Sequence, residues 1–290
     1  MDEPGSKVKR KIARVFPRRT KASPTDELAF YGPPGLFPPQ VDEVHVSVTF
    51  TWDMALAEHL AVQWQRVAPV IVGGPATDMP GGQFTPGLYL APGYVITSRG
   101  CPNRCWFCNV WRREGNVHEL DVVDGWNVLD DNLLACTGQH ICDVFAMLRR
   151  QKQPIQFTGG LEAARLLDWH VELLRRIRLG QMFFAYDTPD DYEPLVEAGK
   201  KLMRAGFPYA GHRLRAYVLI GHPKDTFEAA ERRLIDTIRA RFFPMAMLWR
   251  GQDGKRSAEW VTFQRHWARP EIVNTKSREL WGDLAGGNDP

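Results

Sequence analysis

Between residues 44 and 76 the spacing of hydrophobic residues changes from a period of two to a period of four. Apolar and polar residues alternate over 44–50, which predicts a half-buried strand. Leu56, Leu60 and Trp64 then recur every four residues, as in an amphipathic helix that Asp53 could cap. The segment PVIVGGPA predicts a second buried strand that ends in a glycine turn. Strand, helix and strand at this spacing indicate one βαβ unit with parallel strands.

A longer stretch, from Gly93 to Leu248, alternates strand-like and helix-like segments with short connections. Near-continuous apolar strands separated by amphipathic helices favour a parallel sheet covered by helices. Because the carboxyl ends of parallel strands meet at one edge, we expect the functional residues there. The predicted strands are 93–98, 126–130, 154–158, 181–187, 215–220 and 242–248.

Four amphipathic helices are predicted between these strands, and most have a recognisable start. Pro189 stands at the first helical position, which favours proline, and the same helix should stop at Gly206. The residues expected to begin three of the helices are Asp168, Thr188 with Pro189, and Asp225 with Glu228 in a capping-box spacing.

The chain therefore divides into four parts. After Arg250 the sequence turns polar, and Trp260, Phe263 and Trp267 at helical spacing predict a covering helix. The expected parts are an irregular, basic and proline-rich lead-in over 1–43, a reduced βαβ unit over 44–90, an α/β core over 91–250, and a covering helix with a loose tail over 251–290.

Composition narrows the class of protein without naming a partner. With 37 Lys and Arg against 34 Asp and Glu, the net charge of +3 does not indicate nucleic acid as a partner. The 44% hydrophobic content is that of an ordinary globular chain. No apolar run approaches the roughly 20 residues that span a bilayer, so we expect no membrane partner. The first residues lack the apolar core of a secretory signal, so we expect a cytoplasmic protein.

Three of the five cysteines fall within eight residues, in the segment TSRGCPNRCWFCNVW. Cys101, Cys105 and Cys108 form a C-x3-C-x2-C arrangement, in which three thiolates can reach one soft metal centre and no disulfide pairing uses all three. A structural zinc site needs a fourth ligand, and His118 is the nearest candidate. A cubane iron-sulfur cluster normally takes four cysteines, so three would leave one iron open to a small molecule.

This triplet, with the aromatic Phe107 before its last cysteine, resembles the radical S-adenosylmethionine superfamily. Further segments resemble that family in its order along the chain, namely TSRGCP, VLDDN, FTGGLEA, FAYDT and LIGHPKDT. They are most similar to the branch whose members often carry an N-terminal cobalamin-binding domain. The resemblance covers Gly93 to Leu248 and implies a partial (β/α)6 barrel, with the preceding βαβ unit as a shortened N-terminal domain.

The resemblance implies a cofactor set and a chemistry. A 4Fe-4S cluster held by Cys101, Cys105 and Cys108 would bind S-adenosyl-L-methionine at its open iron and cleave it to a 5'-deoxyadenosyl radical, which abstracts hydrogen from a substrate. A one-electron donor such as flavodoxin or ferredoxin would supply the electron. By position, three residues would contact the adenine, namely Phe107, Gly221 and Pro223. Asp130 and Asp131 would contact the methionine amino group, and Asp187 would contact the ribose. Gly159 and Gly160 would allow a close approach of the backbone.

Several of these residues also have a purely structural explanation. Asp130 and Asp131 could cap the next helix, and Asp187 could cap the helix that begins at Pro189. Gly159 and Gly160 could form a plain turn. Glu162 and Arg165 could form a surface ion pair or reach the cavity. Of the remaining candidates, Cys136 and Cys142 are expected to be structural, and His222 is a better functional candidate than His212.

The sequence departs from the family pattern at two places. Fewer than twenty residues separate Cys108 from the second strand of the core, so the helix usual there is expected to be lost, leaving a more open flank. The N-terminal unit lacks the D-x-H-x-x-G pattern that supplies a cobalamin ligand, so we do not expect cobalamin.

Three functions follow from these observations. The first is a radical S-adenosylmethionine enzyme that abstracts hydrogen from an unknown substrate. The second is a radical-type methyl or methylthio transferase. The third belongs to another class, a non-catalytic zinc or iron-sulfur binding module in which the triplet and His118 hold the metal.

Overall fold

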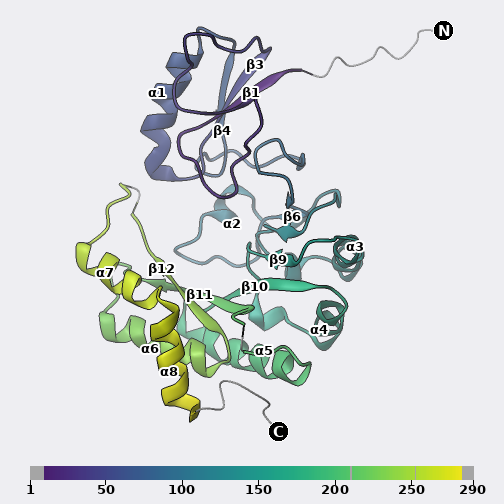
Figure 1. Ribbon diagram of the computed structural model, residues 1–290, viewed down its shortest axis with the longest axis vertical. Coiled ribbons are helices and arrows are strands. Elements are labelled where there is room, and N and C mark those ends of the chain that lie inside the picture. The colour runs from purple at the N-terminus through teal and green to yellow at the C-terminus, as the bar shows by residue number, and fades with distance from the viewer. Residues whose placement is uncertain (1–9, 210, 252, 283–290) are drawn as a thin grey trace, which may run out of the picture. The chain divides into compact units, whose positions relative to one another are not determined.

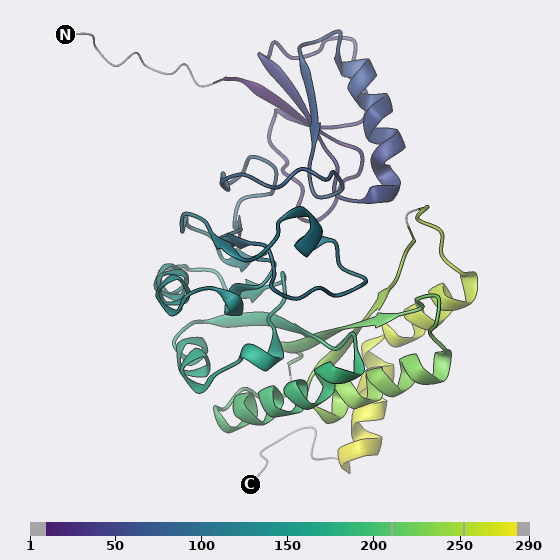
Figure 2. The same ribbon diagram turned by 180° about the vertical axis from the view of Figure 1, so that it is seen from behind.

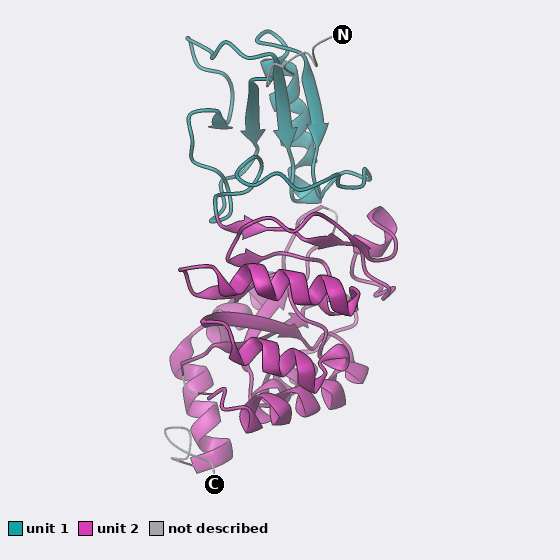
Figure 3. Ribbon diagram, turned by 90° about the vertical axis from the view of Figure 1, so that its right-hand side faces the viewer, with its two compact units in different colours: residues 1–92 teal, residues 93–290 magenta. Residues whose placement is uncertain are grey.

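The computed structural model describes residues 10–209, 211–251 and 253–282. The chain divides into two compact units, residues 1–92 and residues 93–290, which Figure 3 distinguishes by colour. Each unit contains its own parallel sheet. Among the described residues, no helix is long and apolar enough to cross a membrane.

The first unit contains a four-stranded sheet rather than one βαβ motif, and every neighbouring pair of strands is parallel. The expectation of an irregular lead-in over 1–43 is wrong, since two of the strands lie within it. Arg14 explains the error: it is buried, donates to the carbonyl oxygens of Gly87 and Leu88, and pairs with Asp26, so a charge interrupts the apolar pattern of the strand. In order across the sheet, the strands are β2 (Ala29–Tyr31), β1 (Ile12–Phe16), β3 (Glu43–Ser47) and β4 (Val70–Gly73).

Helix α1 (Met54–Trp64) connects β3 to β4 and packs its buried residues against the apolar side of the sheet. Trp64 and Leu60 lie in this core as expected, but Leu56 is 45% exposed. Asp53 does not cap the helix with its side chain. It forms a bidentate ion pair with Arg18 at 2.8 and 3.0 Å, which joins the end of β1 to the start of α1.

The second unit contains a six-stranded sheet whose strands follow one another in chain order, every pair parallel (Figure 1). The sheet is therefore wound in one direction only, and it is open because β5 and β12 form its two edges. All six strands lie where the sequence predicts them, although the first three are shorter. They are β5 (Tyr94–Val95), β8 (Asn127–Val128), β9 (Ile155–Phe157), β10 (Leu179–Ala185), β11 (Leu214–Ile220) and β12 (Phe243–Leu248).

Four helices connect the later strands and follow one another along the outside of the sheet (Figure 2). The connection from β5 to β8 differs, as predicted, because it lacks a full helix. It holds only the single turn α2 (Val110–Arg113) and an antiparallel pair, β6 (Ser98–Arg99) with β7 (His118–Glu119). The four full helices are α3 (Gly138–Arg149), α4 (Asp168–Arg175), α5 (Tyr192–Arg204) and α6 (Phe227–Arg239).

The predicted helix starts are confirmed in part. Pro189 begins a 3-10 turn that leads into α5, with Thr188 and Asp191 in a reciprocal capping arrangement. Asp168 is the first residue of α4 rather than its cap, because the His170 ring accepts from the Leu167 backbone N–H instead. The capping box of Asp225 and Glu228 is also wrong. Thr226 caps α6 by accepting from Ala229 N, which leaves Asp225 free to bind elsewhere.

The C-terminal part contains two helices rather than one helix and a tail. The predicted helix is α7 (Ala258–Trp267), and a second, α8 (Pro270–Trp281), follows it directly with proline at its start. Both pack with α6 and β12 around buried Trp267 and Val273. Helix α8 was not predicted because its sequence has few apolar residues, and it contributes few large side chains to this core.

Candidate cofactor-binding site

The cysteine segment begins directly after β6, where Gly100 makes a sharp turn. Its φ is +83°, and a Cβ there would lie 2.3 Å from the backbone oxygen of Asn116, so no larger residue fits without a shift. Gly100 N donates to Asp131 Oδ2 at 2.9 Å, and Cys101 N donates to Gly115 O at 3.1 Å. The start of the cysteine segment is therefore held by the end of β8 on one side and by the α2–β7 connection on the other.

The three thiols of the triplet are free and partly exposed. A turn places Cys108 N on Cys105 O at 3.2 Å, and the Trp111 indole donates to the same oxygen at 3.1 Å. Burial, together with the nearby thiols of Cys108 and Cys101, raises the pKa of Cys105 to about 11, so the three cysteines lie within electrostatic reach of one another.

The thiols do not yet form a closed ligand set. Among the described residues, no three His, Cys, Asp or Glu side chains converge closely enough to hold a metal ion as they stand. His118 is exposed on β7, where its Nδ1 lies 3.4 Å from Asn116 O. A metal or cluster would therefore require at least one of the three cysteine side chains to turn toward the others, and their segment is irregular rather than held in a helix or strand.

Asp130 is buried beneath the cysteine segment and is fully engaged there. Its carboxylate accepts from Thr97 N and Thr97 Oγ1, both at 2.6 Å, and from Ser98 Oγ at 2.8 Å. Burial raises the pKa of Asp130 despite these donors. The predicted capping role is wrong, because Thr137 caps α3. With 2% of its surface exposed, Asp130 joins β8 to the start of β6 and is poorly placed to meet a ligand.

The next two residues face the cysteine segment itself. Asp131 is half-buried and accepts from Gly100 N, and burial raises the pKa of its carboxyl group. Asn132 is 4% exposed; its Nδ2 donates to Cys101 Sγ at 3.4 Å and to Glu162 Oε2 at 2.6 Å. Its Oδ1 is buried and has no partner among the residues that the structure describes. A buried acceptor without a donor, beside a cysteine of the triplet, is suited to bind a ligand N–H.

The residues after β9 complete this side of the site. Glu162 forms the predicted ion pair with Arg165, whose Nε lies 2.6 Å from Glu162 Oε2. The same carboxylate accepts from the Asn132 amide, which links the ion pair to the site. Gly159 allows a close approach, but of the chain's own backbone, because a Cβ there would lie 2.4 Å from Asp130 O. Gly160 has a φ of +102° and open space beside it.

Asp187 and Asp191 lie after β10 and near the cysteines. Both carboxylates contribute to the raised pKa of Cys105. Asp187 is not a helix cap: it accepts from Leu219 N at 2.9 Å, while Asp191 accepts from the backbone N–H groups of Asp187 and Thr188. Burial, together with the nearby carboxylate of Asp191, raises the pKa of Asp187 to about 7. Asp187 therefore gains or loses its proton near neutral pH.

The end of β11 lies beside the aromatic residues of the cysteine segment. Trp106 is 54% exposed and meets the His222 ring edge-on at a centroid distance of 5.3 Å, and its other side meets Phe107 at 5.4 Å. Gly221 has a φ of +72°, and its N–H donates to the buried carboxylate of Asp225. Pro223 is exposed in the turn that follows.

The other two cysteines differ from the triplet. Burial raises the pKa of the Cys136 thiol to about 11, and its Sγ lies 4.0 Å from Asn132 O. Cys142 is exposed on α3. His140 is buried on the same helix, with Nε2 at 3.3 Å from Thr97 Oγ1, so it belongs to the polar network around Asp130.

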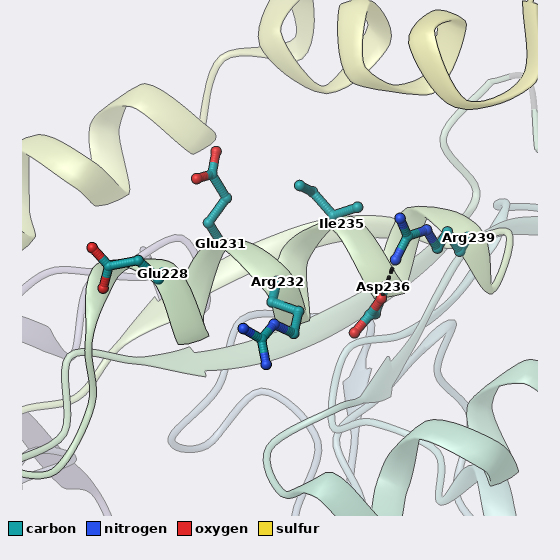
Figure 4. Close-up of a pocket in the computed structure, with 6 residues that line it drawn as sticks. All are labelled: Glu228, Glu231, Arg232, Ile235, Asp236 and Arg239. Carbon is teal, nitrogen blue, oxygen red and sulfur yellow. Dashed lines mark hydrogen bonds and ion pairs between the residues drawn. The ribbon is translucent and has the colours of Figure 1, made fainter.

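A surface hollow along α6 offers no comparable site. Figure 4 shows its six lining side chains, which all come from this one helix, with Arg239 paired to Asp236 at 2.8 Å. The lining residues are Glu228, Glu231, Arg232, Ile235, Asp236 and Arg239. A ligand site needs polar groups that converge from several elements, and here they do not.

The candidate site thus consists of the cysteine triplet and the polar residues that follow β8, β9, β10 and β11. Most of these site residues could be identified from the sequence, but Asn132 and Asp191 were missed. Asn132 follows the two aspartates directly, and its position after a strand end was the available signal. Comparison with known proteins gives no match, either to a protein-family model or to a curated sequence.

Proposed function

We propose that this protein is a radical S-adenosylmethionine enzyme. The main support is the position of the triplet: Cys101, Cys105 and Cys108 follow the first strand of a six-stranded parallel sheet wound in chain order. Such a sheet, with helices after its later strands, is compatible with the partial (β/α)6 barrel that the resemblance to this superfamily implies. Polar residues that follow four further strands lie around the cysteine segment: Asn132 contacts Cys101, Glu162 contacts Asn132, Asp187 and Asp191 lie near Cys105, and His222 contacts Trp106. Enzymes on such sheets bind their ligands at the carboxyl edge.

The donor set fits an iron-sulfur cluster in its chemistry. Three cysteines would hold three irons of a 4Fe-4S cluster and leave the fourth open. When bound, such a cluster would supply one-electron chemistry: reductive cleavage of S-adenosyl-L-methionine to methionine and a 5'-deoxyadenosyl radical that would abstract hydrogen from the substrate. The role of the protein is to bind and orient the cofactor and to exclude water.

The polar residues around the cysteines would bind the cofactor. The unpaired Oδ1 of Asn132 and the carboxylate of half-buried Asp131 are suited to an ammonium group, because both present acceptors beside Cys101. Asp187 would accept a ribose hydroxyl through the oxygen that Leu219 N does not use. The backbone beside Phe107 and the turn at Gly221 and Pro223 would contact the adenine. Gly160, with its open space, would permit a close ligand approach, whereas Asp130 and Gly159 support the site from beneath.

We propose no particular substrate and no particular hydrogen atom as the one abstracted. A flavodoxin or ferredoxin would serve as the electron donor, and the cytoplasm would provide the reducing conditions that three free thiolates require. We do not include cobalamin in the proposal.

Anaerobic reconstitution tests this function. We expect a brown protein that converts S-adenosylmethionine to 5'-deoxyadenosine when dithionite is added. Cys105→Ala should abolish both the colour and the cleavage, because two cysteines hold a cluster poorly. Cys142→Ala is the matched control: it removes an exposed cysteine on α3 and should leave both unchanged.

Two results would contradict the proposal. A colourless protein with one tightly bound zinc would favour the metal-binding module instead. Full cleavage by the Cys105→Ala variant would show that this cysteine is not a cluster ligand.

A further inference from the structure

Asn132 lies beside the triplet, and its side chain donates to the sulfur of Cys101. It begins a 3-10 turn after β8, where asparagine ordinarily caps the turn, yet its side chain makes no capping hydrogen bond. It is 4% exposed instead, with its amide directed between Glu162 and Cys101. The buried amide of Asn132 therefore connects residues that are distant in the sequence instead of capping its own turn.

The chemistry of Glu162 determines which way the Asn132 amide faces. An ionised carboxylate only accepts hydrogen bonds, so the atom 2.6 Å from Glu162 Oε2 must be the amide nitrogen. That nitrogen has two hydrogens, and the second can point to Cys101 Sγ at 3.4 Å. The same Glu162 oxygen accepts from Arg165 Nε, which anchors the carboxylate independently of Asn132.

We propose that Asn132 is a positioning residue that donates an N–H···S hydrogen bond to the Cys101 ligand and thereby raises the reduction potential of the bound cluster. The inference rests on the function proposed above. A hydrogen bond to a cluster thiolate withdraws negative charge from the sulfur, which favours the reduced cluster. The backbone of Cys101 is fixed separately by Gly115 and, through Gly100, by Asp131. Loss of the Asn132 amide should therefore change the electronic state of the cluster more than the position of the loop.

Potentiometric titration of the reconstituted full-length protein, followed by electron paramagnetic resonance, tests this proposal. Asn132→Leu has nearly the same shape but no donor, so its cluster should have a more negative midpoint potential at unchanged iron content. Asn132→Asp replaces the donor with a negative charge and should lower the potential further. Asn109→Leu is the matched control, because Asn109 adjoins Cys108 but is exposed and makes no side-chain cap; its potential should equal that of the wild type.

A measurement on the wild-type protein covers the case in which the variants do not fold. With asparagine labelled by ¹⁵N in the side chain, the reduced cluster should show a hyperfine coupling to ¹⁵N by pulsed resonance. Absence of that coupling, or an unchanged potential in Asn132→Leu with full iron content, overturns the inference alone. A wild-type protein that takes up no cluster overturns the proposed function and this inference together.

Discussion

The two halves of the second unit are held together by different forces. In the site half, residues 93–165, the strands β5, β8 and β9 are two, two and three residues long. In the core half, residues 179–281, β10 and β11 have seven residues each and β12 has six. Short strands provide few ladder hydrogen bonds, so the site half needs other contacts to hold its strand ends in place.

Buried polar side chains provide those contacts. In the core half, buried Thr237 and Ser277 each donate to a carbonyl four residues earlier in the same helix, and Ser277 also bonds the Tyr209 hydroxyl at 2.7 Å within an apolar cluster. In the site half, buried side chains join segments about thirty residues apart, as Asp130 does with Thr97 and Asn132 with Glu162. The candidate site is therefore built on a buried polar network, which can hold ligand-binding groups in fixed positions.

The largest expected effect is the loss of stability when a large side chain is removed from the apolar core. Trp267 is 2% exposed, and Trp267→Ala should lower the free energy of unfolding by about 3–5 kcal/mol, because it leaves a large cavity. Trp106→Ala, at a 54% exposed position in the site half, should cost less than about 0.5 kcal/mol. Urea unfolding of both variants measures the difference, and similar losses would contradict the division into two halves.

A pH-dependent effect is predicted where the two halves meet, at Asp187. Its pKa is raised to about 7 in the folded state, so the folded protein holds this proton more tightly than the unfolded chain does. Stability should therefore fall as the pH rises from about 4 to about 8, by on the order of 3 to 4 kcal/mol from this group.

The variant Asp187→Asn isolates the contribution of that carboxyl group. It cannot ionise but can still accept from Leu219 N, so its unfolding free energy should lack this part of the pH dependence. Urea unfolding at several pH values compares it with the wild type. Parallel pH profiles would show that Asp187 titrates alike in the folded and unfolded states.

The smallest predicted effect concerns the polar network itself. Asp130→Ala leaves the buried Thr97 N–H without its acceptor and should cost about 2 kcal/mol. Thr237→Val removes a hydroxyl that bonds only within its own helix, and should cost less than about 1 kcal/mol. Thermal unfolding compares the two variants. If Thr237→Val loses more stability than Asp130→Ala, the long-range hydrogen bonds of the site half do not stabilise it.

Secondary structure could be predicted where burial follows a simple period. The strands β11 and β12 and the helix α6 between them were found because their apolar residues face one core. The strand β1 was missed because a charged residue, Arg14, is buried within it, where it pairs with Asp26 and donates to the carbonyl oxygen of Leu88. The caps at Asp168 and Asp225 were wrong because each helix begins one residue away from the predicted position, with Leu167 and Thr226 as the N-cap residues.

By itself, the sequence determined the parallel α/β organisation of the second unit, the missing helix after the triplet, and the spacing of Cys101, Cys105 and Cys108, since these depend on neighbours in the chain. Only the tertiary structure decided what the other polar residues do. It buried Asp130 beneath the site, turned Asn132 toward Cys101, and brought Asp187 and Asp191 near Cys105. These roles depend on which strand ends meet at one edge, and a contact between residues thirty or more positions apart leaves no local pattern in the sequence.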